Sequence, residues 1–108
     1  MINRSYADFA WNRTAELLSI DSPSGFTSQA AQWVKAAFEI LGYQAQITNK
    51  GGVLIDLGGE DTEDALLLEA HADTLGAMVA EVKSTGRLRL TPLGGMEPNN
   101  AESENVRI

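Results

Sequence analysis

The sequence predicts an α/β fold in which two N-terminal helices are followed by a mixed β-sheet. In the first forty residues, apolar side chains recur at helical spacing. From residue 43 onward the apolar period changes to two, and glycine-rich turns separate the apolar runs. The 108 residues are 44% hydrophobic and 21% charged, which is enough for one small packed domain or part of a larger one.

We expect the first helix to begin at Ser5, whose hydroxyl can cap it, with Asp8 favouring the helix dipole in the first turn. Its apolar face comprises Tyr6, Phe9, Ala10 and Leu17. The helix should end before residues 21–25, a dense cluster of turn formers.

A second helix should start near Thr27 or Ser28. Its apolar positions follow the spacing i, i+4, i+7, i+8, i+11, namely Ala30, Val34, Ala37, Phe38 and Leu41. Gly42 stands where a helix needs a left-handed residue to end.

The first strands are predicted at residues 43–47 and 53–57, joined by a turn at 49–52. Residues 65–70 form a more continuous apolar run, which is typical of a central strand covered on both faces.

A second hairpin is predicted from strands at residues 75–83 and 87–91, around a turn at 84–86. Residues 93–100 favour a loop or connector, and 106–108 favour the start of one more strand. Two helices and about five strands fit an α/β or α+β layout.

Net charge and composition exclude several classes of protein. A charge of −7 gives no basic footprint for nucleic acid and disfavours docking on anionic membranes. The absence of cysteine excludes disulfides and thiolate ligands. No signal-peptide run and no long apolar stretch are present, so we expect a cytoplasmic protein.

The chemically most informative residue is His71, the only histidine, which follows the apolar run and precedes Asp73 by two positions. On an extended backbone these two side chains point to the same side. Asp73 could then accept a hydrogen bond from one imidazole nitrogen while the other binds a metal. A histidine paired with an aspartate for charge alone is the alternative, and the spacing by itself leaves both open.

Other polar residues favour structural interpretations. The acidic loop of residues 60–64 has no calcium-loop spacing and fits a solvated turn. Ser24 has no histidine at local spacing, which disfavours a serine hydrolase. Trp11 and Trp33 lie on the expected helices and are interpreted as packing residues.

An ordered set of short motifs runs along most of the chain, and in this order it resembles a known family. The motifs are Pro23-Ser24-Gly25, Gly51-Gly52-Val53, His71-Ala72-Asp73-Thr74-Leu75-Gly76-Ala77-Met78-Val79, Gly86 and Leu93-Gly94-Gly95. Over residues 14–108 the chain resembles the N-terminal part of the glutamyl and deblocking aminopeptidases. These form the tetrahedral, dinuclear-metal family numbered forty-two among metallopeptidases.

The resemblance implies a site with two divalent metal ions, zinc or cobalt. His71 would be a ligand of one ion, and Asp73 would be the catalytic-site carboxylate that orients the histidine. Where the family usually has an acidic residue and isoleucine before the glycine, this chain has Thr74 and Leu75. Residues 48–52 also lack the Asp and Asn of the family's Asp-x-x-Gly-Asn hairpin.

The resemblance also implies that residues 1–103 form the first segment of a peptidase catalytic domain, and that 104–108 start an inserted β-domain that is not present. The remaining metal ligands and the general-base glutamate would lie beyond Ile108. The parent protein would remove N-terminal residues from peptides and form a homododecamer.

Two alternatives stay open. The 108 residues alone could be a catalytically inactive fragment that serves as a folding or assembly module. The parent could also be a related zinc exopeptidase or deacylase with a similar His-x-Asp pair.

Overall fold

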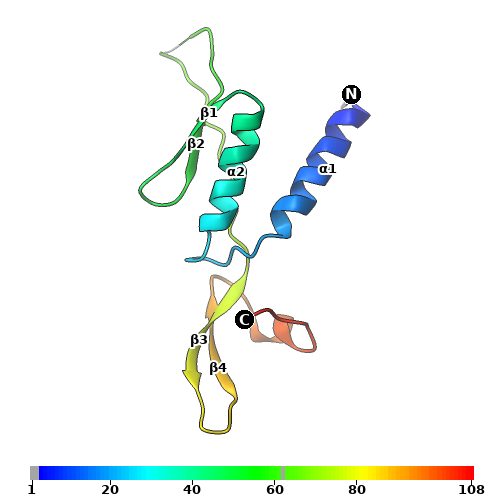
Figure 1. Ribbon diagram of the computed structural model, residues 1–108, viewed down its shortest axis with the longest axis vertical. Helices are drawn as coiled ribbons and strands as arrows, with labels where there is room; N and C mark the ends of the chain where they lie inside the picture. The colour runs from blue at the N-terminus through cyan, green and yellow to red at the C-terminus, as the bar shows by residue number, and fades with distance from the viewer. Residues whose placement is uncertain (1–2, 62) are drawn as a thin grey trace.

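A computed structural model describes residues 3–61 and 63–108 as two helices followed by two β-hairpins (Figure 1). The elements are α1 (Arg4–Leu18), α2 (Ser28–Ile40), β1 (Gln44–Ile47), β2 (Val53–Asp56), β3 (Gly76–Val82), β4 (Leu88–Leu93) and the short 3₁₀ helix η1 (Pro98–Ala101). The predicted α/β class is confirmed, with four strands in the described residues rather than five.

Helix α1 begins two residues earlier than expected. Asn3 is its N-cap, and the Asn3 Oδ1 accepts a hydrogen bond from the Ser5 backbone N–H at 3.2 Å. The prediction that Ser5 caps this helix is therefore wrong, because Asn3 supplies an equally good capping oxygen one residue before the helix starts. At the other end, the Ser19 N–H still reaches the Ala15 carbonyl at 3.2 Å.

Helix α2 ends in a Schellman motif centred on Gly42, which confirms the predicted role of this glycine. Gly42 has a φ of 91° and its N–H donates to the Glu39 carbonyl at 2.9 Å. The Tyr43 N–H donates to the Phe38 carbonyl at 3.1 Å. The Phe38 and Tyr43 rings then meet edge to face with centroids 6.2 Å apart, which provides the apolar contact typical of this motif.

Strands β1 and β2 form the first antiparallel hairpin, as predicted. Their register pairs Gln44 with Asp56 and Ile47 with Val53. The Thr48 N–H donates to the Gly52 carbonyl at 2.8 Å and closes the connecting loop. Both strands contact α2, so the Schellman turn places this hairpin against the second helix.

Strands β3 and β4 form the second predicted hairpin, which extends away from the helices (Figure 1). The ladder runs from Gly76 opposite Leu93 to Val82 opposite Leu88, with a register shift between Val79 and Glu81. In the described residues the strands therefore make two separate two-stranded antiparallel sheets, in place of a single mixed sheet.

The prediction of a central strand at residues 65–70 is wrong for the described structure. This segment contains neither helix nor strand, and Leu66, Leu67 and Leu68 are 85%, 72% and 75% exposed. A central strand needs hydrogen-bonding neighbours on both edges and cover on both faces. No described segment pairs with residues 65–70, so the apolar run has nothing to order it.

The expected strand at residues 106–108 is also absent, since residues 104–108 have no regular secondary structure. Instead, the Arg107 guanidinium donates to the Asp21 Oδ2 at 2.7 Å and ties this segment to the α1–α2 connection. The assignment of 104–108 to an inserted domain stays a prediction.

Few described side chains are fully buried. Ala30 and Ala31 are the buried apolar residues, and Ser22, at 1% exposure, is the buried polar one. None of the helices in the described part of the chain is both long and apolar enough to cross a membrane.

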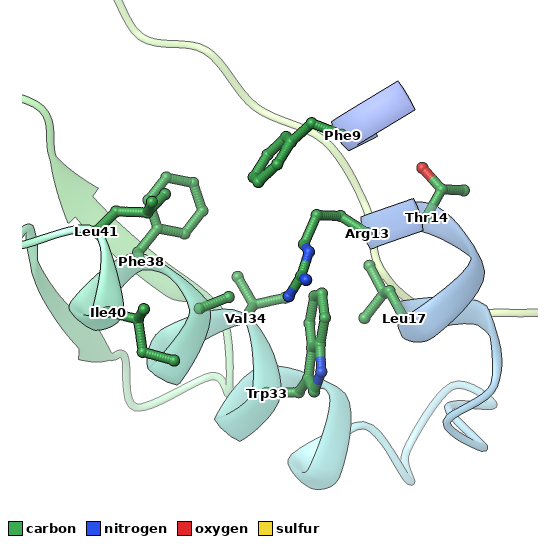
Figure 2. Close-up of a pocket in the computed structure, with 10 residues that line it drawn as sticks. Phe9, Arg13, Thr14, Leu17, Trp33, Val34, Phe38, Ile40 and Leu41 are labelled. Atoms are coloured by element: carbon green, nitrogen blue, oxygen red, sulfur yellow. The ribbon is translucent and has the colours of Figure 1, made fainter. Parts of the chain in front are cut away.

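An apolar groove of about 470 Å³ separates α1 from α2. Figure 2 shows side chains from both helices facing it, among them Phe9, Arg13, Leu17, Trp33, Val34 and Phe38. The Arg13 guanidinium lies 5.7 Å from the centre of the Phe9 ring. Trp33 is partly buried at this groove, whereas Trp11 is 76% exposed, so the packing role expected of Trp11 is not seen. The groove lining contains no carboxylate and no imidazole, so it does not form a catalytic cluster.

Candidate metal-binding site

The candidate site lies where the α1–α2 connection meets the segment leading into β3 (Figure 1). Pro23 and Thr74 form an isolated parallel bridge. The Thr74 N–H donates to the Ser22 carbonyl at 2.8 Å, and the Ser22 hydroxyl donates to the Ala72 carbonyl at 3.0 Å. Two segments about fifty positions apart are therefore joined along their backbones immediately beside His71.

Pro23 packs so tightly against Gly76 that a side chain at Gly76 would not fit. A Cβ added at Gly76 would lie 2.7 Å from the Pro23 Cβ. Contacts between real Cβ atoms are longer than this, so glycine is required for the two segments to approach.

The His71 ring is held by Asp73 through one of its nitrogens. His71 Nδ1 lies 3.1 Å from the Asp73 Oδ1 and 3.0 Å from the Asp73 carbonyl oxygen. The Asp73 carbonyl oxygen and the ionised Asp73 carboxylate have no proton to donate and can only accept. Nδ1 therefore carries the proton and donates. In the neutral form of the ring the lone pair then lies on Nε2, and the side chain is 86% exposed. The hydrogen bond predicted from the His-x-Asp spacing is present, while the metal-binding role of His71 and the catalytic-site role of Asp73 stay predictions.

The Asp73 carboxylate has a second partner that sequence reasoning missed. The Ser24 hydroxyl donates to the Asp73 Oδ2 at 2.5 Å. The hydrogen bond from Ser24, followed by the one from His71, holds the pKa of Asp73 below its usual value. The carboxylate is therefore ionised at neutral pH and accepts from both sides.

The order of these three side chains excludes a serine-hydrolase triad. In such a triad the histidine lies between serine and aspartate and takes the proton of the serine hydroxyl. Here Asp73 lies between Ser24 and His71, and the Ser24 hydroxyl donates to a carboxylate. The sequence, in which Ser24 has no histidine at local spacing, disfavours a serine hydrolase in the same way.

The donor atoms of the described residues fit one ligand of a metal centre but not a whole centre. An exposed imidazole with a free Nε2 is a donor suited to zinc and other late first-row metals. No group of three or more potential ligands exists within residues 3–61 and 63–108. Glu69 lines a recess of about 350 Å³ together with Ala70 and His71. A zinc site needs at least three protein ligands.

The acidic loop of residues 60–64 behaves as the solvated turn expected of it. The Asp61 carboxylate accepts a hydrogen bond from the Glu63 N–H at 2.8 Å, a local turn contact. Every described residue of this loop is exposed.

Comparisons with known proteins agree with the motifs at this site. The sequence profile of the M42 glutamyl aminopeptidase family matches residues 51–108, which include His71 and Asp73. The chain is 39% identical over 93 residues to the "Putative aminopeptidase YhfE" of Bacillus subtilis (strain 168), covering 86% of this chain and 27% of that protein. It is 30% identical over 89 residues to the "Glutamyl aminopeptidase" of Lactococcus lactis subsp. cremoris (strain MG1363), covering 82% of this chain and 25% of the relative.

These matches define the class of protein, and the α/β fold is consistent with it. The chain belongs to the M42 glutamyl aminopeptidase family, and it spans about a quarter of the length of the curated relatives that it matches.

Proposed function

We propose that the complete protein carrying this chain is a metal-dependent aminopeptidase that removes N-terminal residues from peptides. Family membership and the aminopeptidase names of the two relatives support this proposal. The structural observation that carries it is the His71–Asp73 pair, in which Nδ1 donates and Nε2 keeps its lone pair.

His71 would serve as one ligand of a two-metal centre, and Asp73 would hold the ring. The two divalent ions, zinc or cobalt, would supply Lewis acidity to polarise the peptide carbonyl and to make water nucleophilic near pH ~7. The Asp73 carboxylate keeps the proton on Nδ1, which directs the lone pair of Nε2 outward. Its negative charge also makes the imidazole a stronger donor.

The remaining ligands would come from the rest of the complete protein, because the described residues contain no other histidine and no ligand cluster. We therefore propose that the 108 residues alone are catalytically inactive. The test is a calorimetric zinc titration of the isolated chain, for which we expect binding no tighter than about micromolar from a single imidazole. Stoichiometric tight binding by the monomeric chain would contradict this.

A panel of aminoacyl chromogenic substrates tests the activity, with the complete protein assayed before and after chelation. We expect residue release that chelator abolishes and that zinc or cobalt restores. N-acyl amino acids belong in the same panel, since their preferential hydrolysis would favour the deacylase alternative. If no substrate of the panel is hydrolysed in a chelator-sensitive way, both the aminopeptidase and the deacylase assignments are contradicted.

The homododecamer is a proposal that rests on the family resemblance, and the cytoplasmic location stays a proposal from the sequence. Sedimentation velocity of the complete protein tests the first, with a single species near twelve times the monomer mass as the expected result.

A further inference from the structure

We propose that Ser24 is a positioning residue of the metal centre: its hydroxyl locks the Asp73 carboxylate in the orientation that holds His71. This inference rests on the proposed function, and it assigns a role to a residue outside the His-x-Asp pair.

The Asp73 carboxylate needs a second anchor because it is not enclosed. Its side chain is 40% exposed, and the His71 ring that it holds is 86% exposed. A partly exposed carboxylate with one partner can rotate about its side-chain bonds and exchange that partner for water. The Ser24 hydroxyl donates to Oδ2 while His71 Nδ1 donates to Oδ1, so each carboxylate oxygen accepts one side-chain hydrogen bond.

The backbone delivers the Ser24 hydroxyl to this position. The Pro23–Thr74 bridge places residue 24 alongside the Asp73 segment. The Thr74 N–H to Ser22 carbonyl hydrogen bond and the buried Ser22 hydroxyl fix the register of the two segments. Ser24 is therefore held by contacts that do not involve its own hydroxyl, which leaves that hydroxyl free to hold the carboxylate.

Ser22 and Ser24 separate a structural role from a positioning role. The Ser22 hydroxyl donates to the Ala72 carbonyl and joins the backbones, whereas the Ser24 hydroxyl donates to the Asp73 side chain. Removing the first should weaken the docking of the two segments. Removing the second should free the carboxylate and leave the docking in place.

The test compares Ser24→Ala, Ser24→Thr and Ser22→Ala in the complete protein. Zinc affinity is measured on the metal-free protein by competition with a chromogenic chelator, and kcat and KM are measured on the reconstituted protein. For Ser24→Ala we expect zinc affinity and kcat to fall about tenfold with little change in KM, at the low end of losses for residues supporting a ligand. Ser24→Thr keeps the hydroxyl and should recover most of both.

Ser22→Ala is the stability control, since it should lower the melting temperature more than Ser24→Ala does. Unchanged zinc affinity and kcat in Ser24→Ala would overturn the proposal. The proposal would also be overturned if zinc affinity and kcat fell in both Ser24→Ala and Ser22→Ala in proportion to the loss of melting temperature. A Ser24→Thr variant that fails to recover zinc affinity and kcat would overturn it as well.

A measurement on the His71 ring itself keeps this inference separate from the proposed function. Nitrogen-15 shifts of the His71 ring, assigned by comparison with His71→Ala, report which nitrogen carries the proton in the metal-free protein. We expect the Nδ1–H form to dominate in the unmodified protein and to lose population in Ser24→Ala. An unmodified protein that hydrolyses no peptide would refute the aminopeptidase, while the zinc affinity and ring shifts would still decide the role of Ser24.

Discussion

Gly76 and Pro23 touch at a distance that admits no side chain at residue 76. A Cβ built on Gly76 would lie 2.7 Å from the Pro23 Cβ, at the point where β3 starts beside the α1–α2 connection. This contact sets how closely the two halves of the candidate site approach, and it leads directly to a test.

Gly76→Ala should destabilise the complete protein by about 1–3 kcal/mol, the usual cost of forcing extra atoms into a packed contact. Urea unfolding measures the change, and zinc affinity should fall with it because the contact lies beside the His71 segment. Gly95→Ala is the matched control, since a Cβ there meets no atom within 4 Å. Equal stability of the two variants would contradict the predicted clash.

Gly42→Ala should also destabilise the protein, for a different reason. A Cβ at Gly42 meets no atom within 4 Å, but the φ of 91° is unfavourable for a residue with a side chain. We expect a loss of about 1–2 kcal/mol from this conformational term alone. Gly42→Asn should lose less, because asparagine tolerates left-handed backbone better. Thermal unfolding of both variants measures the difference, and an alanine variant as stable as the asparagine variant would argue against the Schellman turn.

Asp73→Asn separates the charge of the carboxylate from its shape. An amide can still accept from the imidazole through its oxygen, but it loses the negative charge that strengthens the ring as a donor. We expect zinc affinity of the complete protein to fall about 10- to 100-fold. The control is Asp8→Asn, which neutralises an exposed carboxylate on α1. A parallel loss in both variants would point to net charge instead of this contact.

The isolated 108-residue chain should bind hydrophobic dyes strongly. Its described buried apolar residues are Ala30 and Ala31, while large apolar side chains such as Leu66–Leu68 are exposed. Apolar surface of this extent normally marks a face that another part of a protein covers. We expect strong anilinonaphthalene sulfonate fluorescence and a broad thermal transition from the chain alone, and neither from the complete protein. Weak dye fluorescence together with a sharp thermal unfolding transition would show that the isolated chain buries its own apolar surface.

Local signals allowed most of the secondary structure to be predicted from the sequence. The spacing of apolar residues located both helices, and Gly42 marked the end of α2 because its positive φ is a local requirement. The turn at residues 84–86 located the second hairpin in the same way. The cap of α1 was missed by two positions because Asn3 and Ser5 are both good capping residues.

Features that depend on contacts between residues far apart in the sequence were predicted less well. Residues 65–70 have the composition of a central strand, but a strand also needs neighbours, and composition does not reveal whether they are present. The His71–Asp73 hydrogen bond spans two residues and was predictable. The Ser24 contact spans 49 positions, and the one sequence signal for it was the Pro23-Ser24-Gly25 motif, whose target could not be inferred from its own spacing.

The Ser22 hydroxyl bond to Ala72 closes a loop of 50 positions, whereas the two hairpins close loops of only a few residues. Loop closure costs more entropy as the loop lengthens, and contacts between distant residues form slowly. The hairpins should therefore form early in folding, and the support of the imidazole should form late. Native-state hydrogen exchange can follow this order, since the Thr74 amide should open in milder denaturant than the amides of the β3–β4 ladder. Loss of the site would then be the first sign of unfolding, and a partly opened molecule would already have lost the contacts of Ser22 and Ser24 that position the His71 segment.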